Sequence, residues 1–145
     1  MLDISLLSTE HLSEVAVLET LCFSEPWSEK SLAFLLTENN FGMVAIEDGR
    51  VLAYGGMTCV LDEGAVTNIA THPDFRSRGI GKALLRRMLD EAKARNIKTI
   101  FLEVRESNLV AQRLYSREGF AVCGKRKGFY KNPTEDALQM IYTTE

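Results

Sequence analysis

The sequence has few of the residues that build metal sites and covalent cross-links. Its 145 residues include three cysteines and two histidines. Cys22, Cys59 and Cys123 are odd in number, widely spaced and free of any C-x-x-C pair, which predicts reduced thiols and neither a disulfide framework nor a zinc site. His11 and His72 are too isolated to form a metal cluster. We therefore expect no metal cofactor.

Long apolar runs and low-complexity tracts are also missing. The longest apolar runs are far short of the ~18 residues that cross a bilayer, and the acidic N-terminus lacks the basic start of a signal peptide. These features predict a cytoplasmic protein without a membrane partner. A net charge of −3 argues against direct binding of nucleic acid and suits a basic peptide. With 46% apolar residues and no repeat, we expect a single domain over residues 1–145, and a monomer.

The first third of the chain predicts a strand, two helices and a hairpin. A strand at 2–7 leads to Ser8, which can cap a helix that continues to about residue 23. Pro26 interrupts this helix, and Ser28 can cap a second one to about residue 37. The elbow between them carries Trp27, the only tryptophan, as a packing plug or a recognition surface. Asp48-Gly49 predicts a hairpin between strands at 41–46 and 51–61.

The remainder alternates between strands and helices. Asp62-Glu63-Gly64 is expected to turn the chain into a strand at 65–71, and helices are expected at 80–95 and 109–118. Further strands are expected at 97–104, 120–130 and 137–143. The predicted order is β-α-α-β-β-β-α-β-α-β-β, an α/β fold in which a mixed sheet of about seven strands carries about four helices.

The loop that joins strand 65–71 to helix 80–95 has the composition of a phosphate cradle. Gly79 and Gly81 permit a tight turn that aims backbone N–H groups at one point, and the helix N-terminus adds partial positive charge. Arg76, Arg78 and Lys82 add full charges. The alternative is a capped loop with solvated basic side chains.

The residues of this loop do not match the sequence patterns of two known glycine-rich loops. A Walker loop would need glycine at position 76 and Ser or Thr at position 83, where Arg76 and Ala83 stand. A Rossmann loop would need glycine at position 84, which is Leu84. The remaining pattern is R-x-x-G-x-G at a strand-to-helix turn.

Other stretches that occur with this loop are Phe23-Ser24-Glu25-Pro26-Trp27-Ser28, Asn68-Ile69-Ala70-Thr71, Leu102-Glu103-Val104-Arg105-Glu106-Ser107-Asn108 and Leu114-Tyr115-Ser116-Arg117-Glu118-Gly119-Phe120. Together they resemble the GCN5-related N-acetyltransferase (GNAT) family over nearly the whole chain. Within that family the resemblance is strongest to the bacterial RimI type, which acetylates the N-terminal alanine of a small-subunit ribosomal protein.

The resemblance implies acetyl-CoA as co-substrate. Strand 68–71 would pair with its pantetheine arm, and the glycine-rich loop would hold its pyrophosphate. Asn108 would bond to the cofactor arm, with a plain N-cap as the alternative or additional role. The implied cofactor-binding residues are Ile69, Ala70, Thr71, Arg76, Ser77, Arg78, Gly79, Ile80, Gly81, Lys82 and Asn108.

The resemblance also implies the catalytic and substrate residues. Glu103, which shares a strand face with Phe101, matches the family's general base, although a solvent-facing strand glutamate is common. Tyr115 matches its general acid, although its spacing from Ala111 would suit a core position. Trp27 and Tyr130 would flank the groove for the acceptor peptide.

These implications lead to an expected activity. The chain is expected to acetylate the N-terminal alanine of a basic ribosomal-protein peptide by direct attack in a ternary complex. An acetyltransferase for lysine side chains or a small amine is the near alternative. A non-catalytic acyl-CoA-binding module is the alternative from another class.

Overall fold

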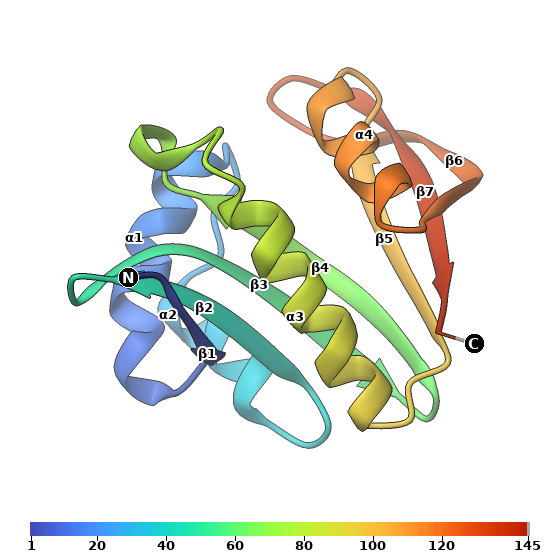
Figure 1. Cartoon of the computed structure of the whole chain (residues 1–145). Helices are drawn as coiled ribbons and strands as arrows, with labels where there is room; N and C mark the ends of the chain where they lie inside the picture. The colour runs from blue at the N-terminus through green and yellow to red at the C-terminus, as the bar shows by residue number, and fades with distance from the viewer. Residues whose placement is uncertain (145) are drawn as a thin grey trace.

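The structure, a computed structural model, describes residues 1–144 and contains one mixed sheet of seven strands within that range (Figure 1). The strands are β1 Asp3–Leu6, β2 Phe41–Glu47, β3 Arg50–Val60, β4 Glu63–Thr71, β5 Thr99–Arg105, β6 Ala121–Tyr130 and β7 Glu135–Thr143. Their order across the sheet is β1-β2-β3-β4-β5-β7-β6. Because β7 pairs with β5 and β6, the last hairpin forms an outer arm of the sheet.

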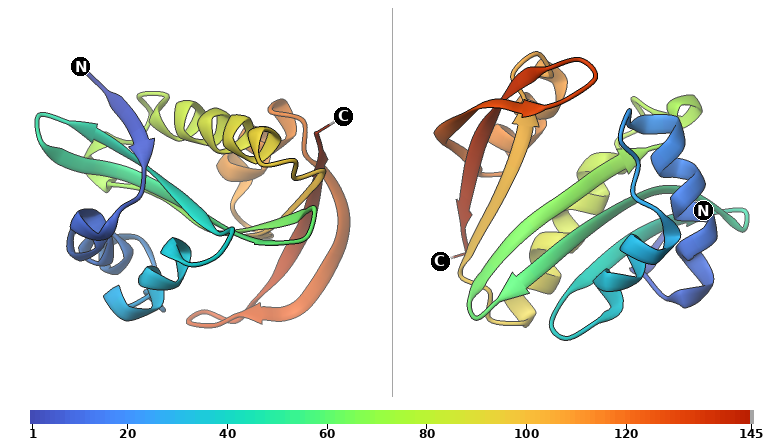
Figure 2. Two further views of the ribbon diagram at one scale, coloured as in Figure 1. Left: turned by 90° about the horizontal axis from the view of Figure 1, so that it is seen from below. Right: turned by 180° about the vertical axis from the view of Figure 1, so that it is seen from behind.

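Helices cover both faces of the sheet. They are α1 Leu12–Cys22, α2 Glu29–Leu32, α3 Ile80–Ala94 and α4 Leu109–Arg117, with short 3-10 turns at Thr9–His11, Ala33–Leu36 and Pro73–Phe75. The two views of Figure 2 place α1 and α2 on one face and α3 and α4 on the other. Within residues 1–144, each helix falls short of the length and apolar character that a bilayer crossing requires. The observed order of strands and helices matches the predicted order, which is thus confirmed. The fold is that of a mixed α/β protein.

The sheet splits between its two parallel strands. β4 and β5 pair only where Glu63 to Ala65 lie beside Thr99 to Phe101. From there the strands diverge, as the light green and orange arrows show in Figure 1 and from behind in Figure 2. β5 pairs with β7 along its whole length, so it follows the twist of the outer arm and leaves β4.

A bulge in β4 lies at the start of this divergence. Val66 pairs with Met57 and Ile69 pairs with Gly55, so Thr67 and Asn68 together oppose the single residue Gly56. A bulge of this kind bends its strand and re-aims the side chains of the extra residues. It therefore turns Thr67 and Asn68 relative to the regular alternation of β4.

Two clusters of apolar side chains pack on opposite faces of the sheet. The α3 face buries a stripe at helical spacing: Ile80, Leu84, Leu85, Met88, Leu89 and Ala92. On the other face, Val15 and Leu18 of α1 pack with Leu32, Leu35 and Tyr54. β5 alternates between its two faces, with Ile100, Leu102 and Val104 buried.

Several predicted boundaries differ from those observed. The Asp48-Gly49 hairpin is confirmed, since both residues have positive φ, at 53° and 76°. Leu61 takes a positive φ of 55°, so the next turn comes earlier than predicted and β4 begins at Glu63. Strand 97–104 was predicted too early, because the Ile97 N–H bonds to Ala92 O and thus closes α3.

The second helix is also shorter than predicted. Ser28 caps α2 as expected, since its side chain accepts a hydrogen bond from the Ser31 N–H. The segment Ala33–Leu36 then tightens into a 3-10 helix. Its end is fixed by the Thr37 N–H and hydroxyl, which both donate to Phe34 O.

Replacement of Gly56 by alanine tests the packing opposite the bulge. A Cβ at this position would lie 2.6 Å from both Leu35 Cδ1 and Thr67 Oγ1. Because both neighbours sit in packed surroundings, we expect Gly56→Ala to lower the free energy of unfolding by about 1–3 kcal/mol, measured by urea denaturation. Gly81→Ala is the control, since its Cβ would meet its nearest neighbour at 3.7 Å. Equal stability of both variants would contradict the close approach at the bulge.

Candidate active site

A cavity of about 690 Å³ opens where β4 and β5 diverge. Val66 to Ile69 of β4 form one wall, and Leu102 to Arg105 of β5 form the other. The elbow after α1 and the β6–β7 loop contribute further residues. Six residues predicted from the sequence line it together: Trp27, Ile69, Glu103, Asn108, Tyr115 and Tyr130.

The other predicted cofactor residues do not line this cavity. Ala70 is buried against β3, and Thr71 ends β4. Residues 76–82 follow as the loop into α3. Ile80 is 3% exposed within the core, so its predicted role in cofactor binding falls to its backbone and not to its side chain.

The glycine-rich loop has the backbone geometry of an anion cradle. Ser77 and Gly79 both take positive φ, at 66° and 77°. The Ala83 N–H makes the bond to Gly79 O that opens the α3 ladder. The amides of Ile80, Gly81 and Lys82 precede that bond, so they are free of the ladder at the positive end of the helix dipole.

The charges on this loop are arranged differently from the sequence-based expectation. Arg78 is ion-paired with Glu47 at 3.2 Å, and Arg76 Nε donates to Thr71 O at 3.1 Å. Both side chains thus fasten the loop to neighbouring strands. Lys82 is exposed and has no ion pair within the described residues. It is the loop cation that remains available to an anion.

Glu103 lies on β5 with its side chain 24% exposed. Its Oε2 atom is buried and lies 3.0 Å from Arg126 Nε. This contact has the distance of an ion pair but not the direction of a hydrogen bond, because the buried Oε2 finds no aligned donor among residues 1–144. Glu103 thus lies against Arg126 through Oε2 and lines the cavity with its partly exposed side chain.

Tyr115 projects from α4 and packs on Phe120 with ring centroids 5.9 Å apart. It belongs to the edge of the core, as its spacing from Ala111 suggested, and it also lines the cavity. Burial, with the nearby Tyr130, raises the pKa of Tyr115 to about 12. Burial and the Glu103 charge likewise raise the pKa of Tyr130 to about 12. Both phenols therefore keep their protons at neutral pH.

Asn108 and Trp27 each make a structural contact and also line the cavity. Asn108 caps α4, since its Oδ1 accepts from the Ala111 N–H at 3.1 Å. Trp27 packs against the α1 cluster and also lines the cavity. The two interpretations offered for each residue from the sequence are thus compatible.

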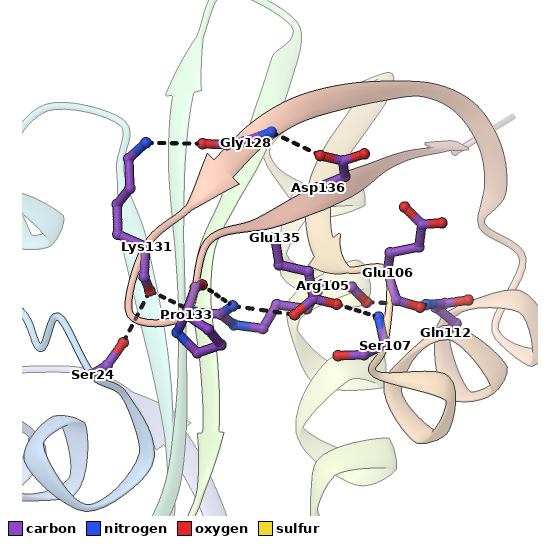
Figure 3. A network of polar contacts seen from close by, with 10 residues as sticks. All are labelled: Ser24, Arg105, Glu106, Ser107, Gln112, Gly128, Lys131, Pro133, Glu135 and Asp136. Atoms are coloured by element: carbon purple, nitrogen blue, oxygen red, sulfur yellow. Dashed lines mark hydrogen bonds and ion pairs between the residues drawn. The ribbon is translucent and has the colours of Figure 1, made fainter.

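A polar network that sequence reasoning missed holds the β6–β7 loop against β5 (Figure 3). Arg105 donates to Pro133 O at 3.0 Å and Lys131 O at 2.9 Å, and pairs with Glu135 at 3.2 Å. Glu135 in turn accepts from the Ser107 N–H at 2.5 Å, and these hydrogen bonds lower the pKa of its carboxyl. The position of Arg105 two residues after Glu103, on the same strand face, was the available signal.

Glu19 was missed as well. It lies on the buried side of α1 at 0% exposure and bonds to Trp27, Tyr54 and Asn68. Its position four residues after Val15, within an apolar helical stripe, could have revealed it.

The fold and site thus combine a sheet that splits between parallel strands, a loop with the geometry of an anion cradle, and a glutamate and a tyrosine in the cleft. The chain matches the family model described as Acetyltransferase (GNAT) family over residues 12–120. It belongs to this family and is an N-acetyltransferase.

Curated relatives are similar over nearly the full chain. The [ribosomal protein bS18]-alanine N-acetyltransferase of Salmonella typhimurium is 37% identical over 139 residues, which cover 94% of each protein. The protein of the same name from Escherichia coli K12 is 37% identical over 136 residues, covering 94% of this chain and 90% of its own length.

Solved structures support the same assignment. The ribosomal-protein-S18-alanine N-acetyltransferase from Escherichia coli superposes with a TM-score of 0.93 at 35% identity, covering 100% of this chain and 95% of its own. The NatC complex bound to Gag peptide and CoA has a TM-score of 0.87 at 20% identity, covering 98% of each chain. The second likeness concerns the fold alone.

Replacement of Arg105 by lysine tests the loop network. Lysine keeps the charge but cannot reproduce the forked contacts to two carbonyls and Glu135. We expect Arg105→Lys to lower the free energy of unfolding by about 1–3 kcal/mol and to speed amide exchange in residues 128–136. Hydrogen exchange with mass spectrometry measures this. The exposed Arg117→Lys on α4 serves as control, and unchanged exchange in 128–136 would show that Arg105 does not hold the loop.

The raised pKa of Tyr115 predicts how this phenol titrates. With a pKa of about 12, it should contribute almost no tyrosinate below about pH 10.5. The absorbance of tyrosinate, recorded as wild type minus Tyr115→Phe, measures that contribution. A difference signal with a midpoint near pH 10 would mean that the phenol is not buried as described.

Proposed function

We propose that the chain transfers the acetyl group of acetyl-CoA to the free α-amino group of an N-terminal alanine on a small-subunit ribosomal protein, by direct attack in a ternary complex. The observation that carries the proposal is the position of the Glu103 carboxyl in the wall of the cleft that Tyr115 also lines. The names of the full-length relatives support the choice of acceptor.

The residues present fit acetyl-CoA as donor. From Val66 onward the β4 edge toward β5 has no pairing strand within residues 1–144, so its N–H and C=O groups can pair with the two amides of a pantetheine arm. The free amides of the glycine-rich loop, with Lys82, would hold the pyrophosphate. Asn108 would contact the arm beside the cavity. When bound, acetyl-CoA supplies the activated thioester.

Glu103 would act as the general base. The attacking amine must be neutral, and a carboxylate that it reaches directly or through one water can take its proton. The pKa of an α-amine is ~7.7–8.0 and that of a lysine side chain is ~10.4, so more of the α-amine is neutral at pH 7. One carboxylate therefore suffices more readily as the base for a chain terminus than for a lysine. Tyr115, protonated at neutral pH, would donate its proton to the departing thiolate.

Trp27 and Tyr130 would flank the acceptor. They line the cavity from the elbow and from the β6–β7 hairpin. Glu25, Glu103 and Glu135 place carboxylates around the same opening, which favours a cationic N-terminus and a basic peptide. We further propose that residues 1–145 act as one monomeric domain in the cytoplasm, where ribosomal proteins are available.

One peptide with a free N-terminal alanine and an internal lysine tests the acceptor. After incubation with acetyl-CoA and the protein, tandem mass spectrometry locates the added acetyl group. Acetyl on the alanine nitrogen is the expected result, and acetyl on lysine would move the function to side-chain acetylation. If the protein binds acetyl-CoA but acetylates neither this peptide nor small amines, the chain is a non-catalytic acyl-CoA-binding module.

Glu103→Gln tests the base. We expect kcat to fall by about 10²–10⁴-fold while acetyl-CoA binding is kept, because the amide cannot accept a proton. Glu106→Gln is the matched control: Glu106 pairs with Lys125 on the surface and does not line the cavity. Steady-state kinetics and calorimetric titration with acetyl-CoA give the two quantities. A Glu103→Gln variant with the turnover of the control would exclude this glutamate as the base.

A further inference from the structure

The most deeply buried charged group in the described chain is the carboxylate of Glu19, on α1. Its side chain is 0% exposed. It is not a cavity residue, and the reaction described above does not use it. A buried carboxylate is costly unless donors surround it, so its contacts define what it does.

Three donors from three different segments converge on Glu19. The backbone N–H of Trp27, in the elbow, donates to Glu19 Oε1 at 2.8 Å. Asn68 Nδ2 of β4 donates to Oε2 at 2.9 Å, and the hydroxyl of Tyr54 on β3 donates to the same atom. Burial and the nearby Glu19 charge raise the pKa of Tyr54, so that its hydroxyl remains a donor.

Two of these donors come from different segments that both line the cavity. Trp27 lines it from the elbow, where the acceptor peptide is proposed to bind, and Asn68 lines it from β4, where the donor is proposed to bind. The β4 bulge contains Asn68. A single side chain therefore fixes the distance between the two segments.

We propose that Glu19 is a positioning residue that holds the Trp27 elbow against β4 and thereby shapes the acceptor site. Without its carboxylate, the elbow backbone at Trp27 loses this partner. The acceptor site is then no longer preorganised, so acceptor binding weakens while the reacting groups Glu103 and Tyr115 stay in place.

The test compares three variants. Glu19→Met fills the same volume without an acceptor atom, and Glu19→Gln keeps an oxygen that can accept from the Trp27 N–H. Glu14→Met is the matched control, because Glu14 also joins α1 to β3, through the Val51 N–H at 2.7 Å, but does not touch the elbow.

Trp27 gives a readout that does not depend on activity, since it is the only tryptophan of the chain. We expect Glu19→Met to shift its fluorescence emission to the red and to increase its quenching by acrylamide. Glu19→Gln should restore most of the wild-type signal, and Glu14→Met should leave it unchanged. A purely structural role would lower the melting temperature in both methionine variants without this difference.

The kinetic arm rests on the proposed function. We expect Glu19→Met to raise the KM for the alanine peptide about tenfold with kcat within about threefold, since the elbow backbone at Trp27 loses its hydrogen bond to a charged group. If the wild-type protein does not acetylate the peptide, the proposed acceptor is wrong, and the Trp27 emission still decides the role of Glu19. Wild-type emission and KM in a folded Glu19→Met variant would overturn the inference.

A measurement on the wild-type protein covers the case that Glu19→Met does not fold. Amide exchange followed by NMR should show the Trp27 N–H protected in the wild-type protein, because it donates to a buried oxygen. Rapid exchange of the Trp27 amide, as in a free loop, would equally overturn the inference.

Discussion

The functional part of this protein depends on the incomplete pairing of two parallel strands. β4 and β5 share hydrogen bonds only near Ala65 and Phe101, after which each strand has its own neighbour and its own twist. An open strand edge is normally a liability in a protein. Here it forms the wall of a cavity, so the backbone of β4 can serve as a binding surface, while β5 presents Glu103 to the same cavity.

A cavity between diverging strands needs bonds that set its width. Two carboxylates far apart in the sequence do this, one at each strand: Glu19 joins the elbow to β4, and Glu135 joins the last hairpin to β5 through Arg105. Each accepts backbone N–H bonds as well as side-chain contacts. The loops that border the cavity are thus tied to strands, which keeps an open site in a defined shape.

The loop before α3 shows how the fold redistributes charge. Arg76, Arg78 and Lys82, within seven residues, predict a strongly positive cradle. In the structure, however, Arg76 and Arg78 bond to neighbouring strands. The binding capacity of the loop therefore comes mainly from backbone amides at the start of α3 and from Lys82. Amides in fixed positions lose little entropy when an anion binds, in contrast to long mobile side chains.

The sequence by itself determined the order of the elements, the Asp48-Gly49 hairpin and the capping of α2 by Ser28, because each follows from local spacing or local turn chemistry. It also indicated Glu103 and Tyr115, through a familial resemblance. The tertiary structure alone decided that Glu103 faces Arg126, that Glu19 meets Asn68, and how wide the cavity is. These depend on contacts between residues far apart in the chain, which form only when the elements pack, and local periodicity carries no information about them.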